Sequence, residues 1–175
     1  MRFFKRAGIE PSEKPSVSSI KAMYLGDIYH KIVKEILHDS GVLYKEEEKV
    51  IDDHRKGFID AIVETKEGLV IYEFKSVNMF KFQKGLDLGH AMQAYTYYLM
   101  YDKEPIVDVR VLYISKDNLD MQEFNVKEIA NIDYITKKDW ETLINYWEKQ
   151  ELPPPVPVEN WECEYCVFKE VCKKY

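Results

Sequence analysis

The stretch GFIDAIVETKEGLVIYEFKSV, residues 57–77, determines the fold that we expect. Two β-prone runs, Phe58–Glu64 and Leu69–Val77, flank the tetrapeptide TKEG, which is typical of a hairpin turn. A turn centred on that tetrapeptide pairs Asp60 with Glu73. Directly opposed side chains leave the same face with Cβ atoms about 4.5 to 5.5 Å apart, where like charges destabilise a sheet. A bound cation would remove this repulsion.

Lys75 lies two residues after Glu73, so the period of a strand places it on the same face, beside the carboxylates. Two acidic oxygen donors and an ammonium group suit Mg²⁺ or Mn²⁺, which prefer carboxylate ligands. The alternative is an ordinary surface ion pair. The run from Leu69 to Lys75 is too apolar for a simple surface strand, and this favours a functional site.

The rest of the chain completes an α/β pattern with antiparallel strands, a helix and a further buried strand. This order indicates one domain with a mixed sheet and helices on its faces. We expect one domain over residues 1–152, then a proline spacer and a cysteine tail over 153–175 that packs on the same domain. The expected helices are Leu25–Leu37, Leu86–Met100 and 140–147, and the further strands are Tyr44–Ile51, Ile106–Ser115 and Met121–Val126.

Composition excludes several classes of protein. The chain has 175 residues, of which 46% are hydrophobic and 14% aromatic, which excludes a disordered or fibrous protein. Its net charge of −6 means that nucleic-acid binding must come from a local groove or a metal. No apolar run reaches the length of a membrane span, and the N-terminus lacks the apolar core of a signal peptide. We therefore expect a cytoplasmic protein without membrane association.

Three cysteines, Cys163, Cys166 and Cys172, are gathered in a short C-terminal segment. They cannot join distant parts of the chain through disulfides. In an intracellular protein, such spacing indicates a metal or redox cluster.

Five short motifs follow one another along the chain. They are Gly26-Asp27-Ile28-Tyr29-His30, Gly57-Phe58-Ile59-Asp60, Glu73-Phe74-Lys75, Gln93-Ala94-Tyr95-Thr96-Tyr97, and Cys163-x-x-Cys166 followed by Cys172. In this order they resemble the RecB-like branch of the PD-(D/E)xK nuclease superfamily, and most closely the CRISPR-associated exonucleases of the fourth Cas family.

The resemblance implies a restriction-endonuclease-like core with a central mixed β-sheet flanked by helices. It implies that His30, Asp60 and Glu73 bind Mg²⁺ or Mn²⁺ together with the Phe74 carbonyl, and that Lys75 is the catalytic lysine. Gln93 and Tyr97 would support the site and contact nucleic acid. Helical spacing alone would predict that His30 is a histidine that packs at the edge of the apolar side of its helix. Gly26 is expected to allow this helix to approach its neighbours closely, which favours the role in the site.

The cysteine tail departs from this family. Cluster-bearing members use four cysteines for an iron-sulfur cluster, one of them before the histidine helix, where this chain has none. Three alternatives remain: a 4Fe-4S cluster with an unusual fourth ligand, a Cys₃His zinc site, or free thiols. Analogy alone favours iron-sulfur.

The leading function is a metal-dependent deoxyribonuclease that cuts single-stranded DNA or strand ends as an exonuclease. The process would be CRISPR adaptation, recombination and repair, or viral genome processing, with the proteins of those pathways as partners. Residues expected to stack bases or meet phosphates near the site are Phe80, Phe82, Tyr95, Tyr97, Tyr98, Lys75, Lys81 and Lys84. The alternatives are a catalytically weak module that binds nucleic acid or partners, and a double-strand endonuclease.

Overall fold

The computed structural model describes residues 7–153, 161–164 and 166–172. The chain divides into two compact units, one of Met23–Lys137 and one that combines Met1–Ala22 with Lys138–Tyr175. The domain boundary expected at residue 152 stays a prediction. Most of the expected proline spacer lies outside the described residues. None of the helices in the described part of the chain has the length and apolar character needed to cross a membrane.

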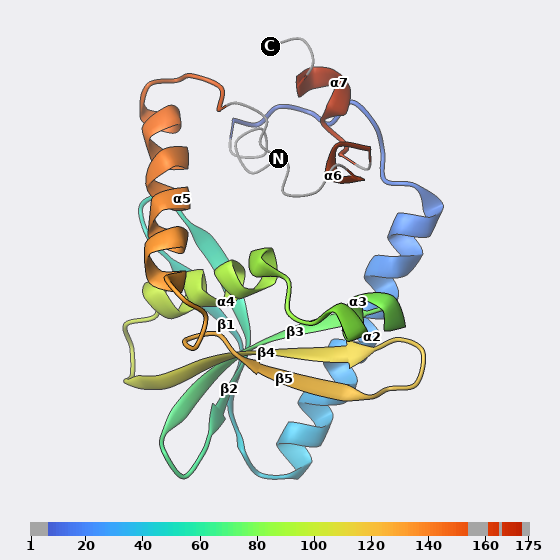
Figure 1. The fold of residues 1–175 in the computed structure, drawn as a ribbon, viewed down its shortest axis with the longest axis vertical. Helices are drawn as coiled ribbons and strands as arrows, with labels where there is room; N and C mark the ends of the chain where they lie inside the picture. The colour runs from blue at the N-terminus through green and yellow to red at the C-terminus, as the bar shows by residue number, and fades with distance from the viewer. Residues whose placement is uncertain (1–6, 154–160, 165, 173–175) are drawn as a thin grey trace. The chain divides into compact units, whose positions relative to one another are not determined.

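The larger unit contains a five-stranded sheet with the order β1-β2-β3-β4-β5 (Figure 1). β3 and β4 run parallel, and the other neighbouring pairs run antiparallel. The predicted mixed sheet is therefore confirmed, and β3 and β4 coincide with the predicted runs. The strands are β1 Leu43–Ile51, β2 Lys56–Glu64, β3 Leu69–Val77, β4 Ile106–Ser115 and β5 Met121–Asn125.

The β2–β3 hairpin has the predicted register but opens at its acidic residues. Its ladder ends at the pair Ala61 and Tyr72, so the next positions in the same register are Asp60 and Glu73. Beyond this point β2 is paired with β1, and β3 is paired with β4. The sheet therefore forks where the two carboxylates lie.

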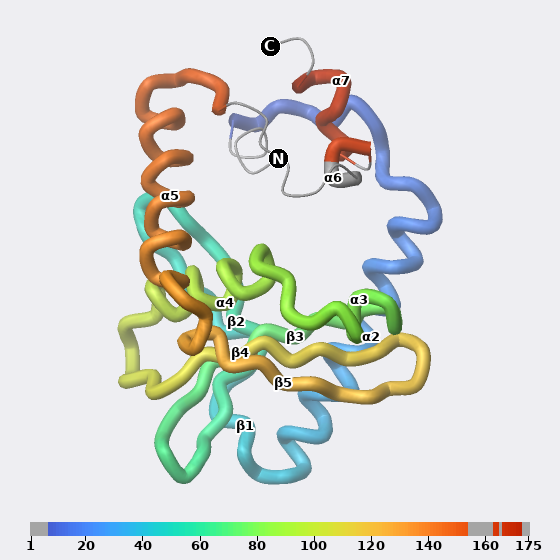
Figure 2. Tube along the Cα trace, viewed as in Figure 1, coloured from blue at the N-terminus to red at the C-terminus, as the bar shows by residue number. Residues whose placement is uncertain are grey.

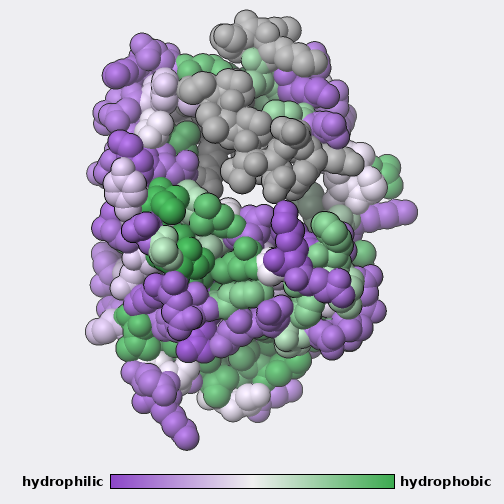
Figure 3. Space-filling model, in the orientation of Figure 1, coloured by the Kyte–Doolittle hydropathy of each residue, from purple (hydrophilic) through white to green (hydrophobic). Residues whose placement is uncertain are grey.

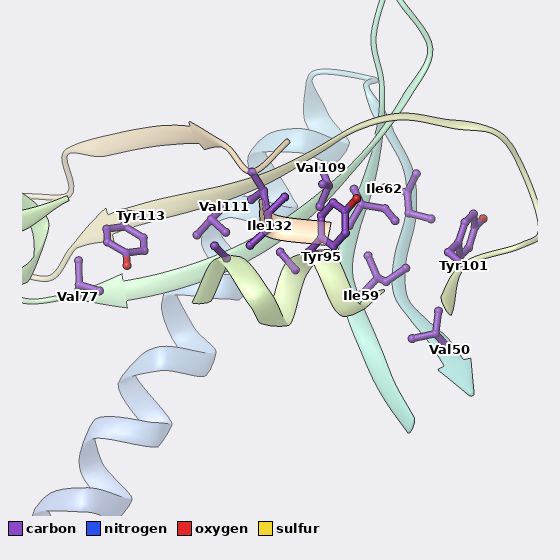
Figure 4. Packing of buried hydrophobic residues seen from close by; sticks show 14 residues of the cluster. Val50, Ile59, Ile62, Val77, Tyr95, Tyr101, Val109, Val111, Tyr113 and Ile132 are labelled. Carbon is purple, nitrogen blue, oxygen red and sulfur yellow. The ribbon is translucent and has the colours of Figure 1, made fainter. Parts of the chain in front are cut away.

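Buried clusters cover both faces of the sheet. Val111 and Tyr113 of β4 belong to the cluster that packs against α4, seen in Figure 4. Leu112 and Ile114 belong to the cluster with Val33 of α2. Because side chains alternate along a strand, these contacts lie on opposite faces. This explains why β4 is apolar almost throughout, as the sequence predicts.

The helices connect and cover these strands. The chain leaves β3 through α3 and α4 and returns as β4 (Figure 2). The sequence did not predict α3, because six residues are too few to show helical periodicity; Asn78 begins this helix by accepting a hydrogen bond from the Lys81 N–H. α5 begins well before the predicted Trp140, and its outward side is mostly hydrophilic (Figure 3). These helices are α2 Val17–Asp39, α3 Met79–Lys84, α4 Leu88–Met100 and α5 Ile132–Glu148, of which α2 begins and α5 ends among residues of the smaller unit.

The smaller unit contains the cysteine tail, with two short helices, α6 Trp161–Glu164 and α7 Lys169–Cys172. The Val167 carbonyl accepts hydrogen bonds from the Ser12 backbone N–H and the Ser12 hydroxyl, both at 2.8 Å. These bonds join the N-terminal lead-in to the cysteine tail within this unit.

Candidate active site

Glu73 is the buried carboxylate of the site. It lies in β3 and is only 2% exposed. Lys75 Nζ donates to Glu73 Oε1 at 2.5 Å, whereas the buried Oε2 has no hydrogen-bond partner among the residues that the structure describes. Burial and the negative charge of Asp60 raise the pKa of Glu73 to about 7, against the opposing effect of Lys75. The effects of Lys75 and His30 therefore do not offset the cost of burying this carboxylate near Asp60.

Asp60 stands at the fork between β2 and β3. Its Oδ2 accepts a hydrogen bond from the Phe74 N–H at 2.7 Å. The Asp60 carboxylate thus accepts the hydrogen bond from a β3 backbone N–H where the β2–β3 ladder has ended and a backbone carbonyl of β2 no longer does so. The fork and the position of Asp60 are therefore parts of one arrangement.

His30 reaches this fork from α2. Its Nδ1 lies 3.6 Å from Asp60 Oδ1, and its ring meets the Phe74 ring edge-on with centroids 5.8 Å apart. Tyr29 and Val33, on the same helix, pack in the cluster that contains Phe74. The packing of α2 on the sheet therefore brings His30 to the acidic residues, as the family resemblance implies and helical spacing alone does not.

The donor set fits a hard divalent cation in its chemistry. Asp60 and Glu73 supply carboxylate oxygens, and the unpartnered Glu73 Oε2 is the kind of atom that a cation stabilises. Within the described residues, however, no three His, Cys, Asp or Glu side chains converge closely enough to hold one ion. The roles of His30, Asp60, Glu73 and the Phe74 carbonyl as ligands stay predictions.

Gln93 and Tyr97 form a hydrogen-bonded pair on α4, with Gln93 Nε2 donating to the Tyr97 hydroxyl at 3.0 Å. The Tyr97 ring lies against Gly57 at the start of β2, where a Cβ atom would come within 2.3 Å of Tyr97 Cε1. Gly57 is thus required for this close approach, three residues before Asp60. By contrast, a Cβ atom at Gly26 would lie 3.6 Å from Ser76 Oγ, which is an ordinary contact. The expectation that glycine is needed here for a close approach of the helix is therefore wrong.

We expect Gly57→Ala to destabilise the protein by about 1–2 kcal/mol, because the new methyl group displaces the Tyr97 ring. Gly26→Ala is the matched control. It makes an ordinary contact inside helix α2, so we expect it to stabilise the protein by about 0.5–1 kcal/mol. Urea unfolding of both variants tests the pair. A Gly57→Ala protein as stable as the wild type would contradict the packing described for Tyr97.

Sequence reasoning missed His90. It lies on α4 three residues before Gln93, so these residues share one side of the helix. Its Nδ1 lies 2.7 Å from the hydroxyl of Tyr113, which in turn is paired with Lys75 in the β3–β4 ladder. Burial and the charges of Lys75 and Lys81 lower the pKa of His90 to about 4. The helical spacing from Gln93 was the signal that could have identified it.

The aromatic residues near the site divide into buried and exposed ones. Tyr95 is 8% exposed and its hydroxyl donates to Asp133, so the expectation that it stacks on bases is wrong. Phe80, directly before Lys81, is 78% exposed. A pocket of about 560 Å³ lies elsewhere in this unit and contains none of the predicted site residues. It is lined by Leu86, Leu88, Glu123, Phe124, Asn125, Glu128 and Ile129.

The three cysteines are free thiols in the structure. Cys163 is exposed, and Cys166 and Cys172 are partly exposed. The part of the chain that the structure describes contains no group of three metal-ligating side chains around them. Neither an iron-sulfur cluster nor zinc is supported by this geometry, and both stay predictions.

Comparisons with known proteins agree with the arrangement. The sequence model of the PD-(D/E)XK nuclease superfamily matches residues 54–173, a range that includes Asp60, Glu73 and Lys75 but not His30. The CRISPR-associated exonuclease Cas4 of Saccharolobus solfataricus is 29% identical over 119 residues, which are 67% of this chain and 51% of that protein. The chain thus spans about half the length of this curated relative.

A solved structure shows the same fold. The crystal structure of SSO0001 matches 86% of this chain and 70% of its own chain, with a TM-score of 0.53. Sequence identity is 24%, so this likeness supports the restriction-endonuclease-like fold and nothing finer.

Proposed function

Since the chain belongs to the PD-(D/E)XK nuclease superfamily, we propose that it is a divalent-metal-dependent deoxyribonuclease that hydrolyses phosphodiester bonds. The observation that carries this proposal is the buried Glu73, which is paired with Lys75, lies near Asp60 and has an unpartnered Oε2. A purely structural site would gain stability by replacing this carboxylate with a neutral residue. Its presence is explained if it acts on a cation and a substrate.

Asp60 and Glu73 would hold Mg²⁺ or Mn²⁺, with His30 and the Phe74 carbonyl as further ligands. When bound, such an ion acts as a Lewis acid toward the phosphodiester. The protein's contribution is to fix the donors. The Phe74 N–H holds Asp60, and the rigid β3–β4 ladder holds the backbone of Glu73.

Lys75 would act on the phosphate itself. Its side chain is 22% exposed, so the ammonium group can reach a substrate while Glu73 keeps it oriented. An ammonium group in this position neutralises negative charge that develops on the phosphate oxygens during hydrolysis, and it can orient the attacking water.

The proposed substrate is single-stranded DNA or a strand end, cut in exonuclease mode. The name of the curated relative supports the exonuclease mode. The exposed Phe80, which follows β3 closely, supports a single strand, because it offers a ring for stacking on an unpaired base. Since the net charge is −6, DNA must be attracted locally, by groups such as Lys75 and Lys81. CRISPR adaptation, recombination and viral genome processing are the proposed settings.

The cysteine tail is proposed as a second metal centre on its spacing alone. An iron-sulfur cluster with an unusual fourth ligand is the version that the family resemblance favours, and zinc is the alternative. The hydrogen bonds from Ser12 to Val167 support a structural role, because they tie the lead-in to the tail.

The test is incubation of end-labelled single-stranded DNA with the protein in Mn²⁺, Mg²⁺ or EDTA. We expect cleavage with either metal ion and none in EDTA, with mononucleotides or short products released from one end. A covalently closed single-stranded circle is the matched substrate, and an exonuclease leaves it intact. Absence of cleavage by folded protein under all conditions would favour the alternative of a binding module.

A further inference from the structure

The hydroxyl of Tyr113 fixes which nitrogen of His90 carries the proton. Tyr113 is fully buried, and burial raises its pKa to about 12, so the hydroxyl keeps its proton. It accepts a hydrogen bond from the Asp87 N–H at 2.9 Å. Donation of its own proton to His90 Nδ1, 2.7 Å away, then gives the buried hydroxyl a partner for both its oxygen and its hydrogen. This arrangement assigns the hydrogen of the neutral His90 ring to Nε2.

The Nε2–H of His90 is an available donor. Among the described residues this N–H has no hydrogen-bond partner. The atom is also absent from the fully buried polar atoms that lack a partner, so it is accessible. The ring is partly exposed on α4. The structure thus uses one side of the imidazole for attachment to Tyr113 and leaves the other side for a ligand that accepts a hydrogen bond.

Two lysines close to the candidate active site, Lys75 and Lys81, act on His90, and each of them is paired with a carboxylate, Glu73 and Asp87 respectively. Tyr113 of β4 is the neighbour of Lys75 of β3 in the parallel ladder. Its contact with His90 therefore brings the imidazole close to the proposed catalytic lysine. Lys81 lies 3.1 Å from Asp87, the residue that begins α4, and its charge also acts on His90. A neutral N–H near two lysine side chains suits an anion with several acceptor oxygens, and DNA supplies such anions at every linkage.

We infer that His90 is a substrate-binding residue whose Nε2–H donates to a non-bridging oxygen of a DNA phosphate next to the one served by Lys75. Tyr113 is the positioning residue that holds the imidazole in the required tautomer. The inference rests on the proposed function, because it needs a DNA strand that passes over β3 and α4.

Two substitutions separate the two sides of the ring. In His90→Asn, the short amide occupies the place of Nδ1 and keeps the bond to Tyr113, but the outer donor is lost. In His90→Gln, the longer amide reaches the place of Nε2 and keeps the outer donor. We expect His90→Asn to raise both the KM for cleavage and the Kd for single-stranded DNA in EDTA about fivefold, with kcat within about twofold. His90→Gln should recover most of the affinity.

A scan of the DNA backbone identifies the phosphate. Single methylphosphonate linkages, which replace a charged oxygen with a methyl group, are placed at successive positions of an oligonucleotide. At one position, the substitution should weaken binding to the wild type about fivefold more than binding to His90→Asn. Equal losses for both proteins at every position would overturn the inference, as would an affinity of His90→Asn equal to that of the wild type.

The binding experiment keeps this inference separate from the proposed function. Cleavage without any coupling between His90 and a phosphate overturns the inference and leaves the nuclease. Coupling without cleavage in either metal ion supports the phosphate contact and overturns the proposed reaction. A protein that neither binds nor cuts DNA contradicts both.

Discussion

We expect Glu73→Gln to lower metal-dependent DNA cleavage by at least about a hundredfold, because it removes the charge of a proposed metal ligand and of the partner that orients Lys75. The same substitution should stabilise the metal-free protein above pH 7. Glutamine has nearly the shape of glutamate but carries no charge, so the cost of burying an ionised group near Asp60 is removed. Loss of activity with a gain in stability is the signature of a residue kept for function.

The pH dependence has a definite sign. The folded protein binds the Glu73 proton more tightly than the unfolded chain, since the pKa rises from 4.5 to about 7. Below pH 4.5 the group is protonated in both states and costs nothing. The cost grows as the pH rises from 4.5 to 7 and reaches at most about 3 kcal/mol above pH 7. The stability difference between Glu73→Gln and the wild type should grow over this interval.

Urea unfolding in EDTA at pH 5 and pH 8 measures the effect. Glu64→Gln is the matched control, because Glu64 lies on the same hairpin but is exposed, so its substitution should change stability little at either pH. A Glu73→Gln protein that is less stable than the wild type at pH 8 would show that the carboxylate is well solvated or well paired without metal. It would remove the electrostatic argument for a cation.

The sequence predicted best what depends on neighbours along the chain. Alternation and turn chemistry located the hairpin, its register and β4, because these follow from local rules. The pairing of Asp60 with Glu73 followed from that register. The opening of the sheet at this pair was not predictable, since it depends on the bond from the Phe74 N–H to Asp60 and on the parallel partner strand.

Residues brought together from distant elements were harder to find. Only the family resemblance placed His30 at the acidic residues, because its own helix gives a signal for packing. His90 escaped notice because its role depends on Tyr113 of β4, a contact between residues 23 positions apart in the chain. Tyr95 was misjudged for the opposite reason: helical spacing does not tell a core tyrosine from an exposed one until the sheet beneath it is known.

Lys75→Met should also lower cleavage, by about 10²- to 10⁴-fold, because it removes the ammonium group proposed to neutralise charge that develops on the phosphate. Its effect on stability should have the opposite sign to that of Glu73→Gln. Without Lys75 the buried carboxylate loses its hydrogen-bond donor, and the pKa of Glu73 rises further. We expect the metal-free protein to lose about 1–3 kcal/mol at pH 8. Lys66→Met, in the exposed hairpin turn, is the matched control and should leave both quantities nearly unchanged.

The double variant Glu73→Gln/Lys75→Met decides whether the two residues act as one unit. If Lys75→Met is destabilising because it strands a buried charge, then it should cost little once that charge is gone, and the double variant should be about as stable as Glu73→Gln alone at pH 8. Cleavage should stay as low as in the single variants, since both act in one step. If Lys75→Met costs as much in the Glu73→Gln protein as in the wild type, then Lys75 stabilises the fold through packing of its chain and not through the charge of Glu73.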